Sequence, residues 1–215
     1  MAKSNSSKRK YDSARRQAQA GETRRQILEA AHKLFVERGY AGTTIEAIAK
    51  EAGVALKTVY AVFKNKWKIL VALLNNSSSN SGEENIPMLE RAGPEAVSQE
   101  RDQRRQLQIF AQVIANNMVG AAYISEIMQV AAKTEEDIDK MVQNLNQQRW
   151  QHMAVAVQQI TSNGPLREKD EALSTDTVWT LTSPEVFLLL TRDRSWSKEK
   201  YAEWLADTLT RALLP

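Results

Sequence analysis

The chain has 215 residues, with 29 Lys and Arg, 26 Asp and Glu, two His and no Cys. The lack of cysteine excludes disulfides and thiolate metal sites, and the widely separated His32 and His152 do not indicate a metal or catalytic centre. No apolar run approaches the ~20 residues that span a bilayer, and the polar, basic start is not that of a secretory signal. We therefore expect a cytoplasmic protein of one or two domains, with no membrane partner and no cofactor.

Positive charge is concentrated in the first third of the chain. Residues 1–75 hold 15 Lys and Arg against 6 Asp and Glu, whereas the remaining residues hold 14 against 20. A basic region of this kind suits binding to a phosphate backbone, although solvated charges can also cluster by chance. The helices expected in the same region favour nucleic acid.

Residues 1–20 are poor in apolar side chains and rich in Ser, Lys and Arg, which predicts a disordered basic arm. Such an arm either contacts phosphates or a minor groove, or is a passive tail. An amphipathic helix is expected next, over residues 22–38, because Ile27, Ala31, Leu34 and Phe35 recur at helical spacing before Gly39.

Residues 43–74 predict two short helices joined by a tight turn, with a third helix close behind. Thr43 and Glu46 form a Thr-x-x-Glu capping box at the start of the first of these helices. Its apolar face consists of Ile45, Ile48, Ala49 and Ala52. Gly53 follows, and glycine tolerates the left-handed backbone that ends a helix.

The second short helix is expected to bury Val59, Val62 and Phe63, and Asn65 is expected to cap the third. Two helices joined in this way are a helix-turn-helix, which places its second helix in the major groove of DNA.

The run ILEAAHKLFVERGYAGTTIEAIAKEAGVALKTVYAVFKNKWKIL, within residues 24–74, resembles the DNA-binding domain of the tetracycline-repressor (TetR) family of bacterial transcription regulators. Two departures are visible. Ala55 stands where the family often has a helix-capping serine, and Ala61-Val62 stands where an aromatic or histidine pair is common. Near the C-terminus, the run WTLTSPEVFLLL is similar to the closing helices of one large TetR subgroup.

The resemblance implies roles for the exposed residues of this region. Lys57 would donate to a guanine edge, Thr58 and Tyr60 would contact phosphate, and threonines or Lys66 at helix starts would hold further phosphates. The candidate DNA-binding residues are Thr43, Thr44, Leu56, Lys57, Thr58, Tyr60, Lys64 and Lys66. The alternatives are solvated charges for the lysines and a core-edge position for Tyr60.

The rest of the chain predicts helices. A polar break over residues 75–100 is followed by helical patterns at 103–118, 121–133, 135–162, 175–192 with an interruption at Ser183-Pro184, and from the Ser197 cap to 214. No segment alternates as a strand does, so the expected fold is all-α: an N-terminal three-helix DNA-binding domain with a helix-turn-helix and a C-terminal helical bundle. The expected domains are the arm at 1–20, the DNA-binding domain at 21–75, and a ligand-binding and dimerisation domain at 76–215.

The resemblance implies a ligand cavity among the middle helices, where methionines and aromatic residues suit an apolar or aromatic effector. The candidate lining residues are Phe110, Ile114, Met118, Tyr123, Met128, Trp150, Met153 and Trp179. His152 could supply a polar handle. The alternative is that these residues are plain core.

The last two helices carry many large apolar residues, which indicates a homodimer seam built from the same helices of two subunits. The candidate seam residues are Phe187, Trp196, Tyr201, Trp204, Leu205 and Leu209. Burial within one subunit is the alternative.

Together these patterns predict a homodimeric repressor that binds a palindromic double-stranded DNA operator and is released by a small-molecule effector. A constitutive DNA-binding protein without an effector is one alternative. A helical enzyme is another, but the chain offers neither a Ser-His-Asp arrangement nor a glycine loop that cradles phosphate.

Overall fold

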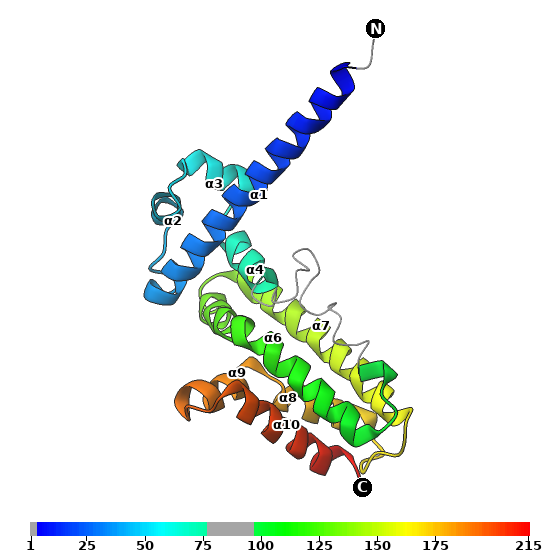
Figure 1. Ribbon diagram of the computed structural model, residues 1–215. Coiled ribbons are helices and arrows are strands. Elements are labelled where there is room, and N and C mark those ends of the chain that lie inside the picture. The colour runs from blue at the N-terminus through cyan, green and yellow to red at the C-terminus, as the bar shows by residue number, and fades with distance from the viewer. Residues whose placement is uncertain (1–3, 77–96) are drawn as a thin grey trace. The chain divides into compact units, whose positions relative to one another are not determined.

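The computed structural model describes residues 4–76 and 97–215, and all regular elements among these residues are helices (Figure 1). The chain divides into two compact units, Met1–Leu73 and Leu74–Pro215. The first unit contains α1 (Ser4–Arg38), α2 (Ile45–Glu51), α3 (Leu56–Phe63) and most of α4 (Lys66–Asn76). The second contains α6 (Gln103–Ala132), α7 (Glu136–Thr161), α8 (Glu171–Leu181), α9 (Pro184–Leu188), the π-helix η2 (Leu189–Asp193) and α10 (Lys198–Leu213). The all-α fold class is confirmed.

Helix α1 is longer than expected, because it begins at Ser4 instead of near residue 22. The expectation of a disordered arm over residues 1–20 is therefore wrong from Ser4 onward. The physical reason is composition: residues 4–20 contain neither proline nor glycine and are rich in Lys, Arg, Gln and Ala, which favour helix. Gly39, at a φ of 69°, ends the helix as expected.

The second half of α1 supports the two short helices, which lie beside it in Figure 1. Ile27, Leu34 and Phe35 of α1 are buried, as are Ile48 of α2 and Phe63 of α3. Val62 was expected in this core but is exposed, because it lies on the outer side of α3 next to Phe63.

Helix α6 is one continuous element, although two helices were expected over residues 103–118 and 121–133. Gly120 lies inside it, and a glycine in a helix costs only about 1 kcal/mol relative to alanine. The buried neighbours Met118, Ala121 and Ala122 offset that cost by packing. By length and composition α6 could cross a membrane, contrary to expectation, but half of its most apolar window is buried inside the unit, as in a core helix.

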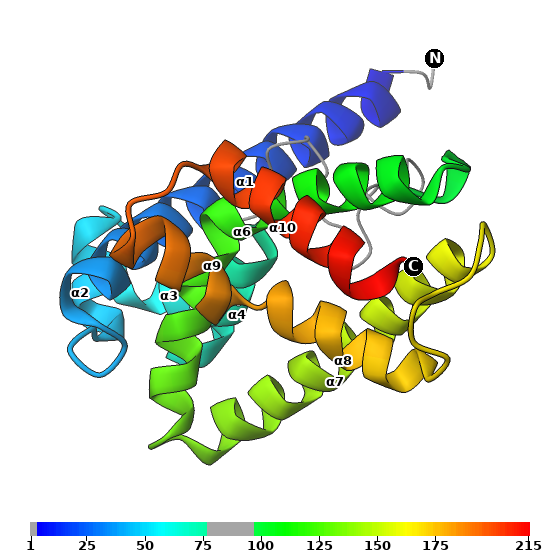
Figure 2. The ribbon, with the colours of Figure 1, turned by 90° about the horizontal axis from the view of Figure 1, so that it is seen from below.

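The core of the C-terminal unit lies where α10 packs against α6, and α7 runs beside α8 (Figure 2). Helix α10 begins after the expected cap, Ser197, whose hydroxyl accepts a hydrogen bond from the Lys200 N–H at 3.1 Å. The expected interruption at Ser183-Pro184 is also present. Ser183 caps α9 and Pro184 occupies its first turn, where a missing N–H costs nothing.

Candidate nucleic-acid interface

The turn between α2 and α3 is formed by the backbone around Gly53. Gly53 has a φ of 67°, its N–H donates to the Lys50 carbonyl at 3.2 Å, and the Val54 N–H donates to the Ala49 carbonyl at 3.0 Å. A side chain at Gly53 would be strained by this positive φ. The turn therefore holds the two short helices in the helix-turn-helix arrangement that the sequence predicts.

Helix α3 presents one exposed stripe to solvent. Lys57, Tyr60 and Ala61 of α3 are exposed and recur at helical spacing, and Lys64 at the C-cap of the helix is also exposed, whereas Val59 on the opposite side is buried. We call these four residues the α3 stripe. The stripe has a lysine at each end and no carboxylate, and neither ammonium forms an ion pair among the described residues. Such a face can donate hydrogen bonds to DNA without first breaking internal ones.

Two further expected residues flank the stripe at the start of α3. Leu56 keeps 39 % of its surface exposed, and Thr58 is half-buried. Ala55 occupies the N-cap position with extended backbone. It makes no side-chain cap, because a methyl group cannot accept a hydrogen bond. The first N–H groups of α3 therefore have no side-chain acceptor at this cap.

The structure places Thr44, not Thr43, at the cap of α2. The Thr44 hydroxyl accepts a hydrogen bond from the Ala47 N–H at 3.1 Å, and the side chain is exposed. Asn65 caps α4 as expected, because its Oδ1 accepts from the Lys68 N–H at 3.1 Å. Thr44 can therefore still meet a phosphate at the N-terminus of α2.

The expectation that Thr43 contacts phosphate is wrong. Its side chain is 0 % exposed, and its hydroxyl lies 3.0 Å from the Leu34 carbonyl and 2.8 Å from the Gly39 carbonyl. The single hydroxyl proton is shared between the Leu34 carbonyl of α1 and the Gly39 carbonyl directly after it. Thr43 is therefore a structural residue of the α1–α2 turn.

Lys66 likewise has an internal role where a phosphate contact was expected. Its ammonium donates to the carbonyls of Tyr40 at 2.9 Å and Thr43 at 3.0 Å, and lies 3.9 Å from the centroid of the Tyr40 ring. These contacts attach the start of α4 to the α1–α2 turn. The Lys66 ammonium therefore links α4 to the α1–α2 turn.

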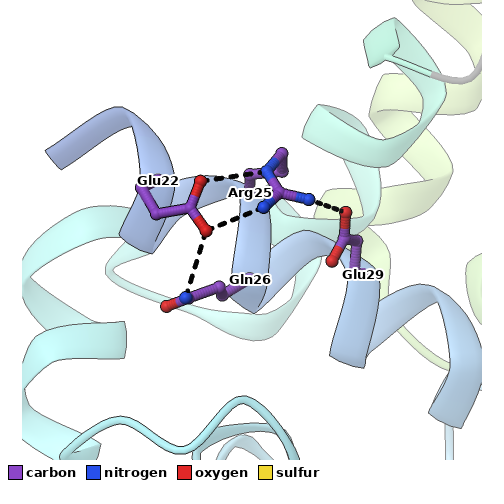
Figure 3. A network of polar contacts seen from close by, with 4 residues as sticks. All are labelled: Glu22, Arg25, Gln26 and Glu29. Carbon is purple, nitrogen blue, oxygen red and sulfur yellow. Dashed lines mark hydrogen bonds and ion pairs between the residues drawn. The ribbon is translucent and has the colours of Figure 1, made fainter. Parts of the chain in front are cut away.

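Two neighbouring arginines of α1 have different surroundings. Arg25 is neutralised by Glu22 and Glu29, and the Gln26 amide also donates to Glu22 (Figure 3). Arg24 instead places its guanidinium 4.6 Å from the centroid of the Phe63 ring of α3. Arg24 is therefore a candidate phosphate contact that the sequence did not reveal, because its position beside α3 depends on the fold.

In the C-terminal unit, the structure gathers only part of the expected ligand set. One apolar cluster contains Phe110, Ile114, Met118 and Met153, with Trp179 packed against it. Met128 is buried outside that cluster, Trp150 donates from Nε1 to the Asp176 carboxylate at 2.7 Å, and Tyr123 is exposed. Tyr123 was expected to line a cavity, but it lies on the solvent side of α6.

Arg149 of α7 is an internal cation whose burial the sequence does not predict directly. It is 8 % exposed, its Nη1 donates to the Trp179 carbonyl at 2.7 Å, and the guanidinium lies 4.4 Å from the centroid of the Trp179 ring. Burial lowers the pKa of Arg149 to about 10, against the opposing effects of Glu185 and Tyr201, so the side chain stays charged near neutral pH. Its place in the apolar stripe of α7, between Val142 and Met153, is the signal that could have revealed it.

The expectation that all six closing-helix residues form a subunit seam is wrong for four of them. Phe187, Tyr201, Leu205 and Leu209 are buried in the core of a single subunit. Helical periodicity cannot distinguish burial within one subunit from burial between two subunits, because both require one apolar helix face. Trp196 and Trp204 remain half-buried, with their rings 6.0 Å apart.

The geometry of the N-terminal unit defines a helix-turn-helix protein of the DNA-binding class. Residues 27–73 match the sequence model of the family described as "Bacterial regulatory proteins, tetR family". Residues 27–73 of the chain therefore carry a TetR-type DNA-binding segment, and curated relatives that the chain resembles are described as HTH-type transcriptional regulators.

The sequence similarity to the curated relative YvkB covers only part of each chain. The chain is 45 % identical over 60 residues to the HTH-type transcriptional regulator YvkB of Bacillus subtilis (strain 168), which is 28 % of this chain and 32 % of YvkB. The chain thus matches about a third of the length of that relative.

Solved structures extend the similarity of fold to both units. The SmeT–triclosan complex has a TM-score of 0.69 at 21 % identity, covering 90 % of this chain and 92 % of SmeT. The regulator FadR from Bacillus subtilis in complex with stearoyl-CoA has a TM-score of 0.65 at 19 % identity, covering 86 % and 96 %. At these identities the likeness concerns the fold alone.

Proposed function

We propose that this protein is a transcriptional regulator that binds duplex DNA as a homodimer, acts as a repressor, and is released by a small-molecule effector. The observation that carries the DNA-binding part is the α3 stripe, a lysine-bearing helix face without carboxylates on the second helix of a helix-turn-helix. A face of this composition suits the major groove, where lysine donates to guanine O6 and N7.

The contacts divide into base reading and phosphate positioning. Lys57, in the first turn of α3, reads a base edge, and exposed Leu56 packs beside it in the groove. Phosphates are contacted by Tyr60 and Lys64 of the stripe, and by Arg24 beside α3. Thr44 and half-buried Thr58 complete the set.

The effector part of the proposal concerns the cluster of Phe110, Ile114, Met118 and Met153. The Nε1 of Trp179, which packs against this cluster, is buried and donates to no described group, and the buried His152 Nδ1 also has no hydrogen-bond partner among the described residues. A buried donor without an acceptor costs about 1–3 kcal/mol. An uncharged, partly aromatic ligand with a hydrogen-bond acceptor would remove that cost while packing against the apolar cluster.

Such an effector acts by favouring the conformation with low DNA affinity, and it shifts the equilibrium only by its difference in affinity for the two states. Two of the similar structures contain ligands in their own chains, triclosan in SmeT and stearoyl-CoA in FadR. A screen of neutral aromatic compounds would identify an effector by two coincident signals, quenching of tryptophan fluorescence and release of DNA.

The DNA-binding proposal is tested by selecting bound sequences from a random duplex pool. Lys57→Ala should lose ~1–3 kcal/mol of discrimination at one base position, whereas Lys64→Ala should weaken all sequences and reduce the slope of log affinity against log salt by about one. Lys140→Ala, on the solvent face of α7, is the control that removes one exposed lysine outside the interface. No enriched sequence, or equal binding by all three variants and the parent, would rule out the assigned interface.

A further inference from the structure

The C-terminal unit has a cavity of about 340 Å³ where the second half of α6 meets α9 and η2. Its lining residues are Glu126, Gln129, Pro184, Glu185, Val186, Leu188, Leu189, Arg192 and Asp193. None of them belongs to the apolar set considered above for the effector. The volume lies within the range of sites that bind small molecules.

Part of the lining is apolar and remains accessible. Val186 is half-buried and Leu188 is buried, but Leu189 keeps 55 % of its surface exposed. Leu189 is also the first residue of η2, and π-helical turns occur frequently at functional sites. An apolar group in the cavity would cover Leu189 and gain the free energy of removing that surface from water.

The charged part of the lining is predominantly acidic, with three carboxylates and one guanidinium. The guanidinium of Arg192 is already engaged, because its Nη1 lies 2.9 and 2.8 Å from the two Glu126 oxygens and its Nε lies 2.8 Å from Asp193. The Glu185 carboxylate forms no hydrogen bond or ion pair with any residue that the structure describes, and only a longer-range attraction to buried Arg149. The cavity thus has a carboxylate without a close cation.

We propose that this cavity binds a small organic monocation that carries an apolar group. The cationic head lies beside Glu185 and Glu126, and the apolar group covers Leu188 and Leu189. Glu185 is exposed, so its attraction for a cation is that of a surface carboxylate, strengthened on the side of the apolar wall where the effective dielectric constant is below that of bulk water. A bound head also competes with Arg192 for Glu126 and so weakens the one ion pair described between α6 and η2.

The test uses benzyltrimethylammonium as the cation and neopentylbenzene as its neutral isostere, titrated into the full-length protein labelled at valine and leucine methyl groups. We expect the cation to shift the methyl signals of Val186, Leu188 and Leu189 in a saturable manner, with at least fivefold higher affinity than the neutral isostere. Phenylpropionate, an anion of similar size, should not bind.

Glu185→Gln keeps the size of the side chain and should weaken cation binding about fivefold, while leaving the weaker binding of the neutral isostere unchanged. Glu203→Gln, an exposed carboxylate on α10 outside the lining, is the control. Equal affinity for the cation and its isostere, or no loss in Glu185→Gln, would overturn the proposal. The proposal would also be overturned if the methyl signals of the lining residues changed with protein concentration and not with the cation. Such a result would show that a second copy of the chain covers the cavity.

All nine lining residues belong to the C-terminal unit, so binding is measured without DNA. A failure here would leave the DNA-binding proposal intact, and a failure of DNA binding would leave the cavity intact.

Discussion

Thr43 and Lys66 both stabilise the α1–α2 turn from inside the N-terminal unit. Both were expected to touch DNA, since the sequence places each near a helix start, where anions bind. In the structure, the Thr43 hydroxyl and the Lys66 ammonium satisfy backbone carbonyls of residues 34–43. The distinction depends on tertiary contacts, which sequence spacing does not contain.

Thr43→Val should lower the free energy of unfolding by ~1–3 kcal/mol, because valine fills the same space but removes the one hydroxyl donor that the Leu34 and Gly39 carbonyls share. The measurement is urea unfolding followed by circular dichroism. Thr44→Ser keeps the hydroxyl that caps α2 and should remain near the parent. If Thr43→Val were as stable as the parent but bound DNA more weakly, Thr43 would be a DNA contact after all.

Tyr201 predicts how the stability of the C-terminal unit changes at high pH. Its side chain is fully buried and its hydroxyl lies 3.3 Å from the Leu181 carbonyl, and burial raises the pKa of the phenol well above its ordinary value of about 10. The folded protein therefore keeps a proton that the unfolded chain loses above pH 10. Stability from this group is present below pH 10 and is lost as pH rises further.

The expected slope for Tyr201 is at most about 1.4 kcal/mol per pH unit above pH 10. Tyr201→Phe should be less stable at neutral pH, through loss of the hydrogen bond, but should lose less additional stability between pH 10 and 11. Thermal unfolding across that range measures the difference. Parallel curves for the parent and the variant would contradict the assigned pKa shift.

At the scale of elements, the helix-turn-helix could be predicted well because its signals are local. Gly53 marks the turn, Asn65 caps α4, and the buried positions of α2 and α3 follow helical spacing. The cap of α2 was misplaced by one residue because Thr43 and Thr44 are both chemically competent caps. Helix α6 was wrongly divided at Gly120, since the sequence does not show how much packing offsets a glycine.

Ala55 gives the clearest prediction for an element. It is the N-cap of α3 without a side-chain hydrogen bond, so Ala55→Ser should raise the free energy of unfolding of the N-terminal unit by about 1 kcal/mol. Ala61→Ser, at an exposed interior position of the same helix, should give no gain because serine competes with the helical backbone there. Equal effects of the two serines, measured by thermal unfolding, would show that the cap position is not limiting.

For the whole molecule, the candidate sites were predicted unevenly. The exposure of Lys57 and Tyr60 on α3 could be inferred, because helical spacing places them away from the buried residues of the same helix. An apolar face such as that of α10 is buried either within one subunit or between two, and Leu205 shows that the first applies there. Arg149 and Arg24 could not be assigned from spacing alone, because their partners come from other helices.

The proposed homodimer is tested by sedimentation at micromolar concentration. Two recognition helices of a dimer reach successive major grooves ~34 Å apart or a multiple of that distance, which requires a near-palindromic site. Trp196→Glu should shift the parent dimer toward monomer, because it places a charge beside the half-buried Trp204. Leu205→Ala should instead cost ~2–5 kcal/mol of stability without changing the mass of the folded species. A monomeric parent would contradict the homodimer.

The early start of α1 also affects how quickly the protein could capture DNA. A disordered arm over residues 4–20 could sample a radius of up to ~55 Å, whereas the same residues as a helix extend only ~25 Å. A shorter capture radius reduces the acceleration of association that flexible basic tails provide. A helical arm, however, loses little backbone entropy when it docks on DNA. Any contribution of the arm to DNA affinity would therefore appear as a slower dissociation rate and not as a faster association rate.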